Sequence, residues 1–440
     1  MKNPANIKAT MSHSKPKEPH SPAQDTEIAV IGPGPVGCLT ALAIAQSTAF
    51  ELTLVGPKAE LNQHQRDTRT TAFMGPSVTM LKNLDLWKDL KEQAAPLKRL
   101  HMIDDAGTLF RAPDCQFDAE ELGLSSFAEN IPNSALMTQL TQRLTDHPRI
   151  NWLNTAAVTN IKIENQTQPG TITTKEGDQI TAQVIIGADG ARSLCRTKTG
   201  IKEHHWAYDQ SAIACSFTHE LPHHATSIEL HRPTGPLTLI PLAPGKASLV
   251  WSLSPTEAEQ IAKLNDKEFS KRLYEASHAM WGEITSVEKR AVFPIKGMKL
   301  EKFAANRIAL VGEAAHVIPP IGAQGLNLGL RDAACLSDVL SAYESLNTDS
   351  KSWEDAYTAK RKQDIWSRTW IIDMLNKSLL LSFMPLKAAR IAGLNAMKAS
   401  QTLRQTLMQE GLTGGGTLPA LMQAKEKAKN PASLNLNTTG

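Results

Sequence analysis

Residues 27–45 read EIAVIGPGPVGCLTALAIA, a short apolar run, a glycine-rich turn and a second apolar run. Glu27 to Ile31 predicts a buried strand, and the run after the turn predicts a helix. The turn has the spacing GxGxxG: Gly32 permits a tight bend, Gly34 lets the backbone approach a pyrophosphate, and Gly37 lets the helix pack on the sheet. The segment therefore predicts the first βαβ unit of a dinucleotide-binding α/β fold, with a structural glycine-rich turn as the alternative.

One position departs from that pattern. The second predicted strand, Leu52 to Val55, is expected to end in an acidic residue that holds the ribose hydroxyls. Gly56 and Pro57 follow it instead, and Glu51 and Glu60 lie at the wrong ends to substitute. The ribose must be held in another way, or bound less tightly.

Two later segments predict strands that end in carboxylates. Gln183 to Gly190, QVIIGADG, predicts a strand that ends in Asp189–Gly190, where α/β sheets bind ligands. An ordinary Asp-Gly turn is the alternative. Arg307 to Asp332, RIALVGEAAHVIPPIGAQGLNLGLRD, predicts a strand, a turn rich in Gly and Pro, and a helix that begins near Gly325. Unpaired N–H groups at such a helix N-terminus attract an anion.

Composition narrows the class of protein. A chain of 440 residues can hold two domains or one large composite. The net charge of +3 is too small to favour nucleic acid as a partner. Five scattered cysteines without a CxxC pair argue against disulfides and zinc and favour a reducing, cytoplasmic location. No run of about 18 apolar residues predicts a membrane span.

The order of the motifs, GxGxxG, then GADG, then GEAAH…PP.GAQG.N, resembles the class A flavoprotein aromatic hydroxylases. These are single-component FAD monooxygenases with the para-hydroxybenzoate hydroxylase fold. The segments Asp67–Leu81 (DTRTTAFMGPSVTML) and Tyr208–Ser252 are most similar to the ubiquinone-biosynthesis hydroxylases among them. The resemblance extends from Glu27 to Met422.

The resemblance implies an α/β fold. It combines a Rossmann-like FAD-binding domain of the glutathione-reductase type, an inserted mixed or antiparallel β-sheet substrate domain, and C-terminal helices. The FAD-binding domain is expected in three segments, residues 26–104, 146–200 and 299–345. A helical or substrate-side insertion (105–145) and the β-sheet substrate domain (201–298) interrupt it, and C-terminal helices (346–424) follow it. A disordered N-terminal extension (1–25) and a flexible tail (425–440) are expected at the ends.

The resemblance also implies roles for residues. The adenosine diphosphate of FAD is expected along Gly32, Gly34 and Gly37, with Arg69 near the flavin and Asp189 near the pyrophosphate. Glu313, after Gly312, stands where the family has Asp to hold the ribityl chain. Pro320 and Gly322 are the expected catalytic positions beside the flavin ring, Pro320 through its carbonyl. The helix start is expected to bind the flavin through Gly322, Gly325, Leu326 and Asn327.

The substrate region predicts an antiparallel sheet, because residues 208–300 alternate apolar and polar positions. Leu239, Pro241 and Leu242 are candidates to line the substrate cavity, although core packing alone also explains them. The cluster of His219, His223, His224 and His231 is compatible with a metal site, but a solvated turn flanked by strand histidines is favoured, because no cysteine or carboxylate constellation accompanies them. His316 is tempting as a base, but a packing or hydrogen-bonding role explains it at least as well.

The segment Tyr357 to Met397 predicts long helices with aromatic and aliphatic residues and interspersed cations. The residues in question are Trp366, Trp370, Ile371, Leu375, Leu379, Phe383, Arg361, Lys362, Arg368, Lys377, Lys387 and Arg390. Docking on the rest of the protein is the ordinary explanation. A more specific explanation is peripheral contact with the inner membrane or with a partner enzyme of quinone biosynthesis.

The function implied by the resemblance is hydroxylation of a small aromatic molecule, expected to be a polyprenylated phenol of ubiquinone biosynthesis. FAD would be reduced by NAD(P)H or another donor, and O₂ would form a flavin C4a-hydroperoxide that transfers an OH group. No second nucleotide-binding βαβ unit is visible, so a nicotinamide donor would bind transiently. Two alternatives remain: a flavin dehydrogenase or reductase, and a non-catalytic, accessory member of a quinone-biosynthesis complex.

Overall fold

The structure is a computed structural model that describes residues 24–58, 67, 69–106, 113–347, 349–380, 392–393, 395–413 and 416–424. Most of the predicted N-terminal extension, the predicted tail, and Phe383, Lys387 and Arg390 lie outside these residues. The described helices are α1 (Pro35–Ser47), α3 (Gly75–Asn83), α4 (Trp87–Leu90), α5 (Asn133–Thr145), α6 (Leu194–Thr199), α7 (Pro255–Ala262), α8 (Asp266–Ala276), α9 (Gln324–Leu340), α10 (Lys351–Leu380) and α12 (Gln401–Thr413), with the short 3₁₀ turns η1 (Ala119–Leu122), η2 (Gly312–Ala314) and η3 (Ala420–Met422).

The first sheet carries the three motifs. Its strands run in the order β18-β19-β11-β1-β2-β8, with β10 paired to β11 and β9 paired to β10. The strands β19, β11, β1, β2 and β8 are parallel, so their carboxyl ends lie at one edge. The bounds are β1 (Gln24–Ile31), β2 (Leu52–Val55), β8 (Ile150–Leu153), β9 (Val158–Lys162), β10 (Gly170–Thr174), β11 (Gln179–Gly187), β18 (Ala304–Ala305) and β19 (Ile308–Leu310).

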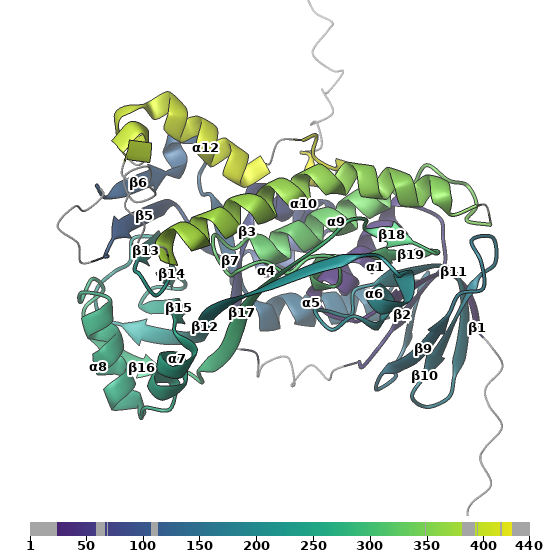
Figure 1. Ribbon diagram of the computed structural model, residues 1–440, viewed down its shortest axis with the longest axis horizontal. Helices are drawn as coiled ribbons and strands as arrows, with labels where there is room; N and C mark the ends of the chain where they lie inside the picture. Colours follow the sequence, from purple (N-terminus) through teal and green to yellow (C-terminus); the bar gives the residue numbers. More distant parts are fainter. Residues whose placement is uncertain are drawn as a thin grey trace, which may run out of the picture.

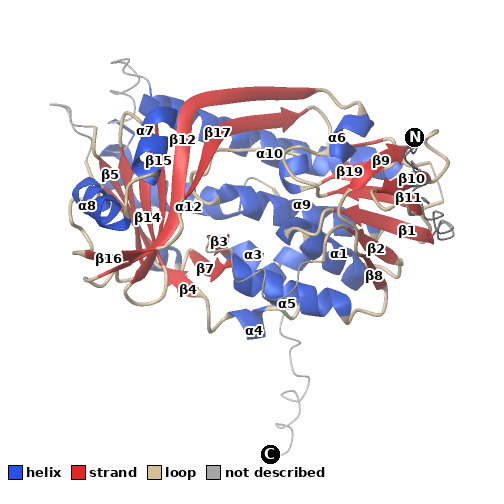
Figure 2. Ribbon diagram, turned by 90° about the horizontal axis from the view of Figure 1, so that it is seen from below, coloured by secondary structure: helices blue, strands red, loops and turns tan. Residues whose placement is uncertain are grey.

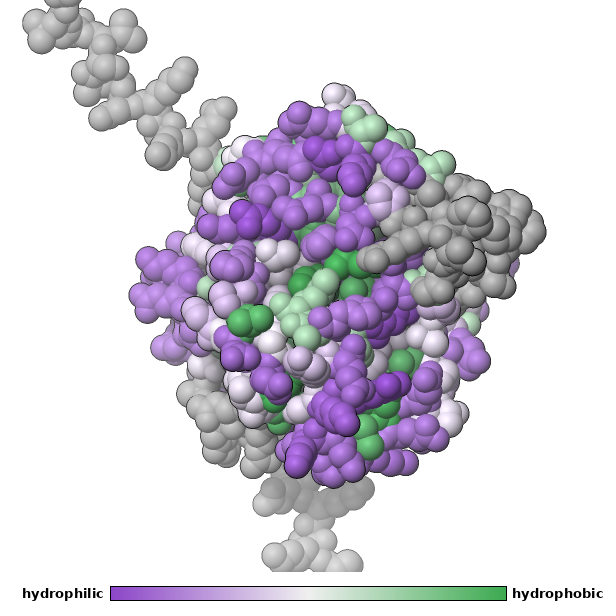
Figure 3. Space-filling view, turned by 90° about the vertical axis from the view of Figure 1, so that its left-hand side faces the viewer, coloured by the Kyte–Doolittle hydropathy of each residue, from purple (hydrophilic) through white to green (hydrophobic). Residues whose placement is uncertain are grey.

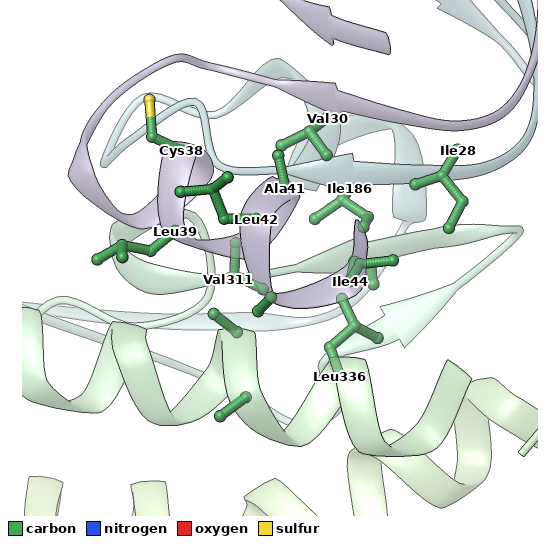
Figure 4. Packing of buried hydrophobic residues seen from close by; sticks show 14 of the residues in the cluster. Ile28, Val30, Cys38, Leu39, Ala41, Leu42, Ile44, Ile186, Val311 and Leu336 are labelled. Atoms are coloured by element: carbon green, nitrogen blue, oxygen red, sulfur yellow. The ribbon is translucent and has the colours of Figure 1, made fainter. Parts of the chain in front are cut away.

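Helix α1 is the centre of the core around this sheet. Its buried residues run from Gly37 to Ala45 without a polar stripe, because the sheet covers one side and α9 the other. Figure 4 shows Leu39, Leu42 and Ile44 between the strand residues and Leu336 of α9. Burying each such side chain stabilises the fold by about 2 kcal/mol. A helix that is apolar on all sides is stable only in the interior of the protein. Burial of α1 therefore holds the glycine-rich turn at its start in place against the sheet.

The second sheet has the order β16-β12-β15-β14-β13-β5-β6, and β17 also pairs with β12. All pairs are antiparallel except β13 with β5, so the sheet is mixed. The long strands β12 and β17 extend from this sheet along the molecule toward α6 (Figure 2). The bounds are β5 (Arg99–Asp104), β6 (Cys115–Asp118), β12 (Glu203–His219), β13 (Thr226–His231), β14 (Leu237–Pro241), β15 (Lys246–Leu253), β16 (Ile284–Val287) and β17 (Ala291–Leu300).

A small third sheet, β3 (Thr70–Met74), β7 (Ala128–Pro132) and β4 (Ala95–Leu97), lies between the two large ones (Figure 2). The strands β5 and β6 form a hairpin pair, so the predicted boundary between residues 104 and 105 falls inside one supersecondary unit. Residues 105–145 contribute strands as well as helix α5. The pairing of β5 with β13 places this segment in the second sheet. The local sequence pattern does not predict this long-range pairing.

Helix α10 lies along α9 across the front of the molecule (Figure 1). At the opposite end from the first sheet, helices α7 and α8 cover the outer face of the second sheet. The surface at this end is mostly hydrophilic, with hydrophobic residues in a few separate patches (Figure 3). Within the described residues, no helix combines the length and the apolar character that a membrane span requires.

Candidate flavin site

The three motif loops meet where the parallel strands of the first sheet end. The Gly32 N–H donates to the Val55 carbonyl at 3.0 Å, and the Ala188 N–H donates to the Ile31 carbonyl at 2.8 Å. The Val311 N–H donates to the Gly187 carbonyl at 3.0 Å. Backbone bonds therefore hold the ends of β1, β11 and β19 side by side, at the edge where α/β sheets bind ligands.

The buried Arg196 ties the second motif to the third. Its guanidinium donates to the Ala191 carbonyl at 2.8 Å and to the Ala314 carbonyl at 3.2 Å. It also forms an ion pair with Glu203 at 2.6 Å. Removing this side chain would leave two loop carbonyls without a partner, so Arg196 positions the loops around the site.

The glycines of the first motif have distinct steric surroundings. A Cβ on Gly32 would lie 2.5 Å from the Ala188 oxygen, and one on Gly37 would lie 2.0 Å from the Gly32 oxygen. A Cβ on Gly34 would meet no atom within 4 Å. Gly32 and Gly37 therefore allow close backbone packing, whereas Gly34 borders open space at the start of α1.

The loop before α9 is held in an unusual backbone conformation. Gly322 and Ala323 both have positive φ, +63° and +54°, and Ala323 is the residue that precedes the helix. Pro319 is buried, whereas Pro320, Gly322 and Gly325 are exposed. A non-glycine residue in the left-handed region costs about 1 kcal/mol or more, so surrounding contacts must fix this turn.

Such contacts exist on both sides of the loop. Met298 of β17 and Val317 exchange backbone hydrogen bonds of 2.8 and 3.0 Å. At the helix start, the Gln324 side chain accepts a hydrogen bond of 2.5 Å from Arg368 of α10. The loop is thereby anchored to the long strand and to the long helix.

A buried ionic network lies beneath the loop. Asp332 of α9 is fully buried, and it accepts hydrogen bonds from the Gly312 N–H at 3.0 Å and from His316 at 2.7 Å. Arg361 of α10 forms an ion pair with the other oxygen of Asp332 at 2.7 Å. Burial alone would raise the pKa of Asp332, but the charges of His316 and Arg361 keep it lowered. His316 is 2% exposed and bonded to Asp332, which favours the hydrogen-bonding interpretation over a catalytic base.

Two of the cations of α10 belong to this buried network. Arg361 and Arg368 are buried, and Asp364 receives hydrogen bonds from both, at 2.6 and 2.9 Å. Burial alone would raise the pKa of Asp364, but the charges of Arg361, Arg331 and Arg368 lower it to about 2. The helical spacing of these residues did not distinguish buried arginines from exposed lysines.

Asn327 joins α9 to the strand that follows Arg69. Its amide donates to the carbonyls of Ala72 and Ala323 at 2.8 and 2.7 Å, and it accepts from the Met74 N–H at 2.9 Å. These three backbone partners give the Asn327 side chain a positioning role, and its contact with the cofactor stays a prediction. The Leu326 side chain packs against the main core, and its contact with the cofactor also stays a prediction.

Arg69 and Glu313 face the same region. Arg69 forms a paired contact with Asp67 at 2.8 and 2.9 Å, and its side chain is 64% exposed. Asp67, with a smaller contribution from the charge of Glu313, raises the pKa of Arg69. Glu313 is exposed. The structure thus brings together residues that are far apart in the sequence and that the motifs assigned to the flavin end.

Asp189 has local partners. Its carboxylate accepts hydrogen bonds from the Ser193 hydroxyl at 2.5 Å and from the Cys195 N–H at 3.1 Å. These bonds hold the turn that leads into α6, and each uses one lone pair of a carboxylate oxygen. Asp189 therefore orders its own loop, and any contact with a pyrophosphate must use the remaining directions.

Gly56, the departure noted above, has a steric explanation. It has a φ of +146°, and a Cβ there would lie 2.4 Å from the Cδ of Pro33. Pro33 is the second residue of the GPGPVG turn, so the proline in the turn and the glycine at the end of β2 fit each other. An acidic side chain at position 56 would require both to move.

The predicted substrate residues divide into two groups. Leu239 is 1% exposed and belongs to the cluster between the second sheet and helices α7 and α8, which favours core packing. The Pro241 carbonyl accepts a hydrogen bond of 2.8 Å from buried Asn130 of the third sheet, and Leu242 follows it. Pro241 and Leu242 thus lie where the second and third sheets meet.

The histidines also have protein partners. His219 and His223 contact Trp281, with ring centroids 4.9 and 5.9 Å apart, and His231 pairs with Glu229 at 3.1 Å. Among the described residues, no group of three His, Cys, Asp or Glu has a metal-binding arrangement.

The residues at the strand ends fit a flavin dinucleotide. Neither α1 nor α9 has a side-chain cap or an acidic residue in its first turn, so both leave N–H groups available to an anion. A Cβ on Gly34, Gly190 or Gly325 would meet no atom within 4 Å, which leaves room for a ligand against the backbone. An anionic pyrophosphate at α1 and an electron-rich ring edge at α9 match these two helix ends.

Residues 25–369 match the family model described as an FAD binding domain. The chain belongs to this family. It is 30% identical over 395 residues to 3-demethoxyubiquinol 3-hydroxylase of Escherichia coli K12, with 88% of this chain and 99% of that protein covered. It is 27% identical to the ubiquinone hydroxylase UbiL of Rhodospirillum rubrum, with 89% and 90% covered. The p-nitrophenol 4-monooxygenase PnpA of Pseudomonas putida DLL-E4 has the same fold, with a TM-score of 0.71, 18% identity, and 90% and 100% coverage.

Family membership confirms the predicted fold, FAD as the cofactor, and the predicted class, an FAD-dependent aromatic hydroxylase. The electron donor and the individual site residues stay predictions. Sequence reasoning missed the structural roles of Arg196, Arg361 and Asn130, each of which bonds to a residue distant in the sequence. Arg196 was visible beside the second motif, but nothing in the sequence indicated its partners.

Proposed function

We propose that this protein hydroxylates the aromatic ring of a polyprenylated phenol, an intermediate of ubiquinone biosynthesis, using FAD, O₂ and NAD(P)H or another electron donor. The observation that carries the proposal is the likeness to the E. coli 3-demethoxyubiquinol 3-hydroxylase, which spans 99% of that enzyme. A likeness over the full length includes the sheet that forms the substrate side as well as the FAD motifs. Bound FAD would supply the electron transfer and oxygen activation.

In this proposal the protein holds the cofactor by its backbone. Gly32, Gly34 and the start of α1 would bind the pyrophosphate through N–H groups. Glu313 would accept hydrogen bonds from the ribityl hydroxyls, one methylene further from the backbone than an Asp. The start of α9, from Gly325, would direct its dipole at the edge of the ring that becomes negative on reduction.

The protein must also keep water from the reacting atoms. The loop Pro319 to Gly325 has the buried network of Asp332 on one side and β17 on the other. Such anchoring would hold the Pro320 carbonyl and Gly322 in fixed positions next to a bound flavin. A fixed loop that excludes water favours transfer of oxygen to the substrate over release of hydrogen peroxide.

Deletion of the gene tests the substrate class. Mass spectrometry of the quinone fraction is expected to show less ubiquinone and an accumulated precursor that lacks one ring hydroxyl. Complementation by the wild-type gene should restore the quinone, and complementation by a Gly34→Glu variant should not, because a carboxylate there would oppose the pyrophosphate. An unchanged quinone profile in the deletion strain would contradict the proposal.

A further inference from the structure

A cavity of about 370 Å³ lies between α10 and the ends of the long strands, lined by His204, Lys299, Glu301, Lys302, Thr358, Lys362 and Trp366. It is outside the flavin site, since none of the predicted cofactor residues lines it. Lysines dominate the lining. The volume is within the range of sites that hold small ligands or headgroups.

The Trp366 ring forms a part of the cavity wall that is held in place by a hydrogen bond. Its indole N–H donates to the Leu300 carbonyl at 3.0 Å, so the ring is held between α10 and β17. The Lys362 and Lys299 ammonium groups lie 4.5 and 5.4 Å from the ring centroid. Two cations close to one ring repel each other, and an anion bound in the cavity would relieve that repulsion.

The acidic residue in the cavity already has partners. Glu301 pairs with Lys202 and with His204, each at 3.4 Å. Within the described part of the chain, Lys299 and Lys362 form no ion pair, and Lys302 interacts with Asp355 only through its charge, without a direct ion pair. The cavity therefore has an excess of positive charge that its own carboxylate does not neutralise, and it is complementary to a phosphate group.

The next turns of α10 expose apolar side chains on the adjoining surface. Lys362, Trp366, Trp370 and Met374 follow one another at intervals of four residues, so they form a continuous ridge along the helix. Trp370 is 63% exposed, Met374 43% and the neighbouring Ile371 48%. Exposed Trp beside Lys is the combination that lies at the level of lipid headgroups, with the apolar part in the acyl region.

We infer that this ridge is a docking surface for an anionic lipid bilayer, in which the cavity around Trp366 binds a lipid phosphate and Trp370, Ile371 and Met374 enter the interface. Charge complementarity selects the occupant, because a neutral surface would leave the lysines uncompensated. The inference names the membrane partner of the proposed function, but it rests on the surface of α10 and not on the reaction at the flavin. A bilayer at this surface would present a polyprenylated substrate to the enzyme from the lipid phase.

The test uses the full-length, FAD-loaded protein and sedimentation with vesicles. One set of vesicles contains phosphatidylcholine alone, and the other contains phosphatidylcholine with phosphatidylglycerol. The double variant Lys299→Glu/Lys362→Glu reverses the charge of the cavity. Its matched control is Lys267→Glu/Lys271→Glu, the same charge change on two exposed lysines of α8.

The expected result is binding to the anionic vesicles that falls at least roughly tenfold in the cavity variant and stays near the wild-type value in the α8 control. Trp370→Ser/Met374→Ser is expected to weaken binding most at high salt, where the electrostatic attraction is screened. Equal loss in both charge variants, or equal binding of the wild type to neutral and anionic vesicles, would overturn the inference. Quenching of tryptophan fluorescence by inorganic phosphate without vesicle binding would also overturn it, because the occupant would then be a soluble anion.

Two further measurements distinguish a loss of membrane docking from a loss of hydroxylation. Flavin absorbance and hydroxylation of a detergent-soluble, short-chain prenylphenol are measured for the same samples. Cavity variants that keep both but lose vesicle binding support the docking surface. A wild type that binds anionic vesicles and hydroxylates no phenol refutes the proposed function and leaves the docking surface standing.

Discussion

At the scale of the residue, the motif glycines were recognisable because their role is steric and local. Gly32, Gly34 and Gly37 act through their own backbone, so spacing alone predicts them. Side chains whose partners lie far along the chain were less predictable. Asn327 and Leu326 sit within a motif, yet one holds the backbone of β3 and the other packs in the core. The groups that such a side chain contacts are set by the tertiary structure, which the spacing of residues in a motif does not specify.

Gly56 gives a prediction at this scale. The substitution Gly56→Asp restores the acidic residue expected at the end of β2, but its Cβ would meet Pro33 and its φ is unfavourable. We expect weaker FAD binding, by roughly tenfold or more, since the GPGPVG turn must shift. Quenching of flavin fluorescence on titration measures this affinity. Tighter FAD binding by the variant would show that the turn accommodates the side chain and that the ribose lacked only a carboxylate.

Asp364 gives a second prediction at this scale, in the pH dependence of stability. Its pKa is lowered from 3.8 to about 2 in the folded protein, so its stabilising contribution is complete above pH 4 and is lost as the pH falls toward 2. The size of that contribution is roughly 2 kcal/mol. Asp364→Asn should therefore unfold more readily in urea at pH 5 and show a smaller loss of stability on acidification.

The control for this measurement is Asp355→Asn, which removes an exposed carboxylate from the same helix. It is expected to leave the free energy of unfolding at pH 5 nearly unchanged. An Asp364→Asn protein with the same acid dependence as the wild type would refute the role assigned to this buried pair.

At the scale of the element, strand and helix bounds followed the hydrophobic pattern closely around the motifs. The expected strand Leu52 to Val55 is β2, and the helix expected near Gly325 begins at Gln324. Helices α7 and α8 were not foreseen within the region predicted as sheet, because the alternating segments around them dominated the pattern. The helix α10 was expected from its spacing, whereas its buried arginines were not.

The start of α9 offers a prediction that separates helix stability from cofactor binding. Gly325 lies in the first turn, it is exposed, and a Cβ there meets no atom. Gly325→Asp places a negative charge at a helix N-terminus, which should stabilise the apoprotein by about 0.5 kcal/mol. The same charge should weaken FAD binding at least tenfold, because it occupies the position assigned to the electron-rich flavin edge.

Gly325→Ala is the matched variant without the charge. It should keep most of the FAD affinity and also stabilise the helix, since alanine is the better helix former. Thermal unfolding of the apoproteins and flavin titration of all three proteins provide the comparison. Unchanged FAD affinity in Gly325→Asp would place the flavin elsewhere.

At the scale of the whole molecule, the fold was predicted from the family resemblance that the order of three motifs carries. Each of these motifs marks the end of one parallel strand. The division of the second and third sheets was less predictable. The parallel pairing of β5 with β13 and the bond from Asn130 to Pro241 join segments more than 100 residues apart. These contacts assemble the second sheet and join it to the third, and only the folded structure reveals them.

The most direct test of the account is oxygen transfer by the purified, FAD-loaded protein under ¹⁸O₂, with NAD(P)H as donor and a prenylated phenol as substrate. One labelled oxygen atom is expected in the ring of the product, and Gly325→Asp is expected to lose that product. Oxidation of NAD(P)H with release of hydrogen peroxide and no labelled product, across a series of ring-substitution patterns, would contradict it.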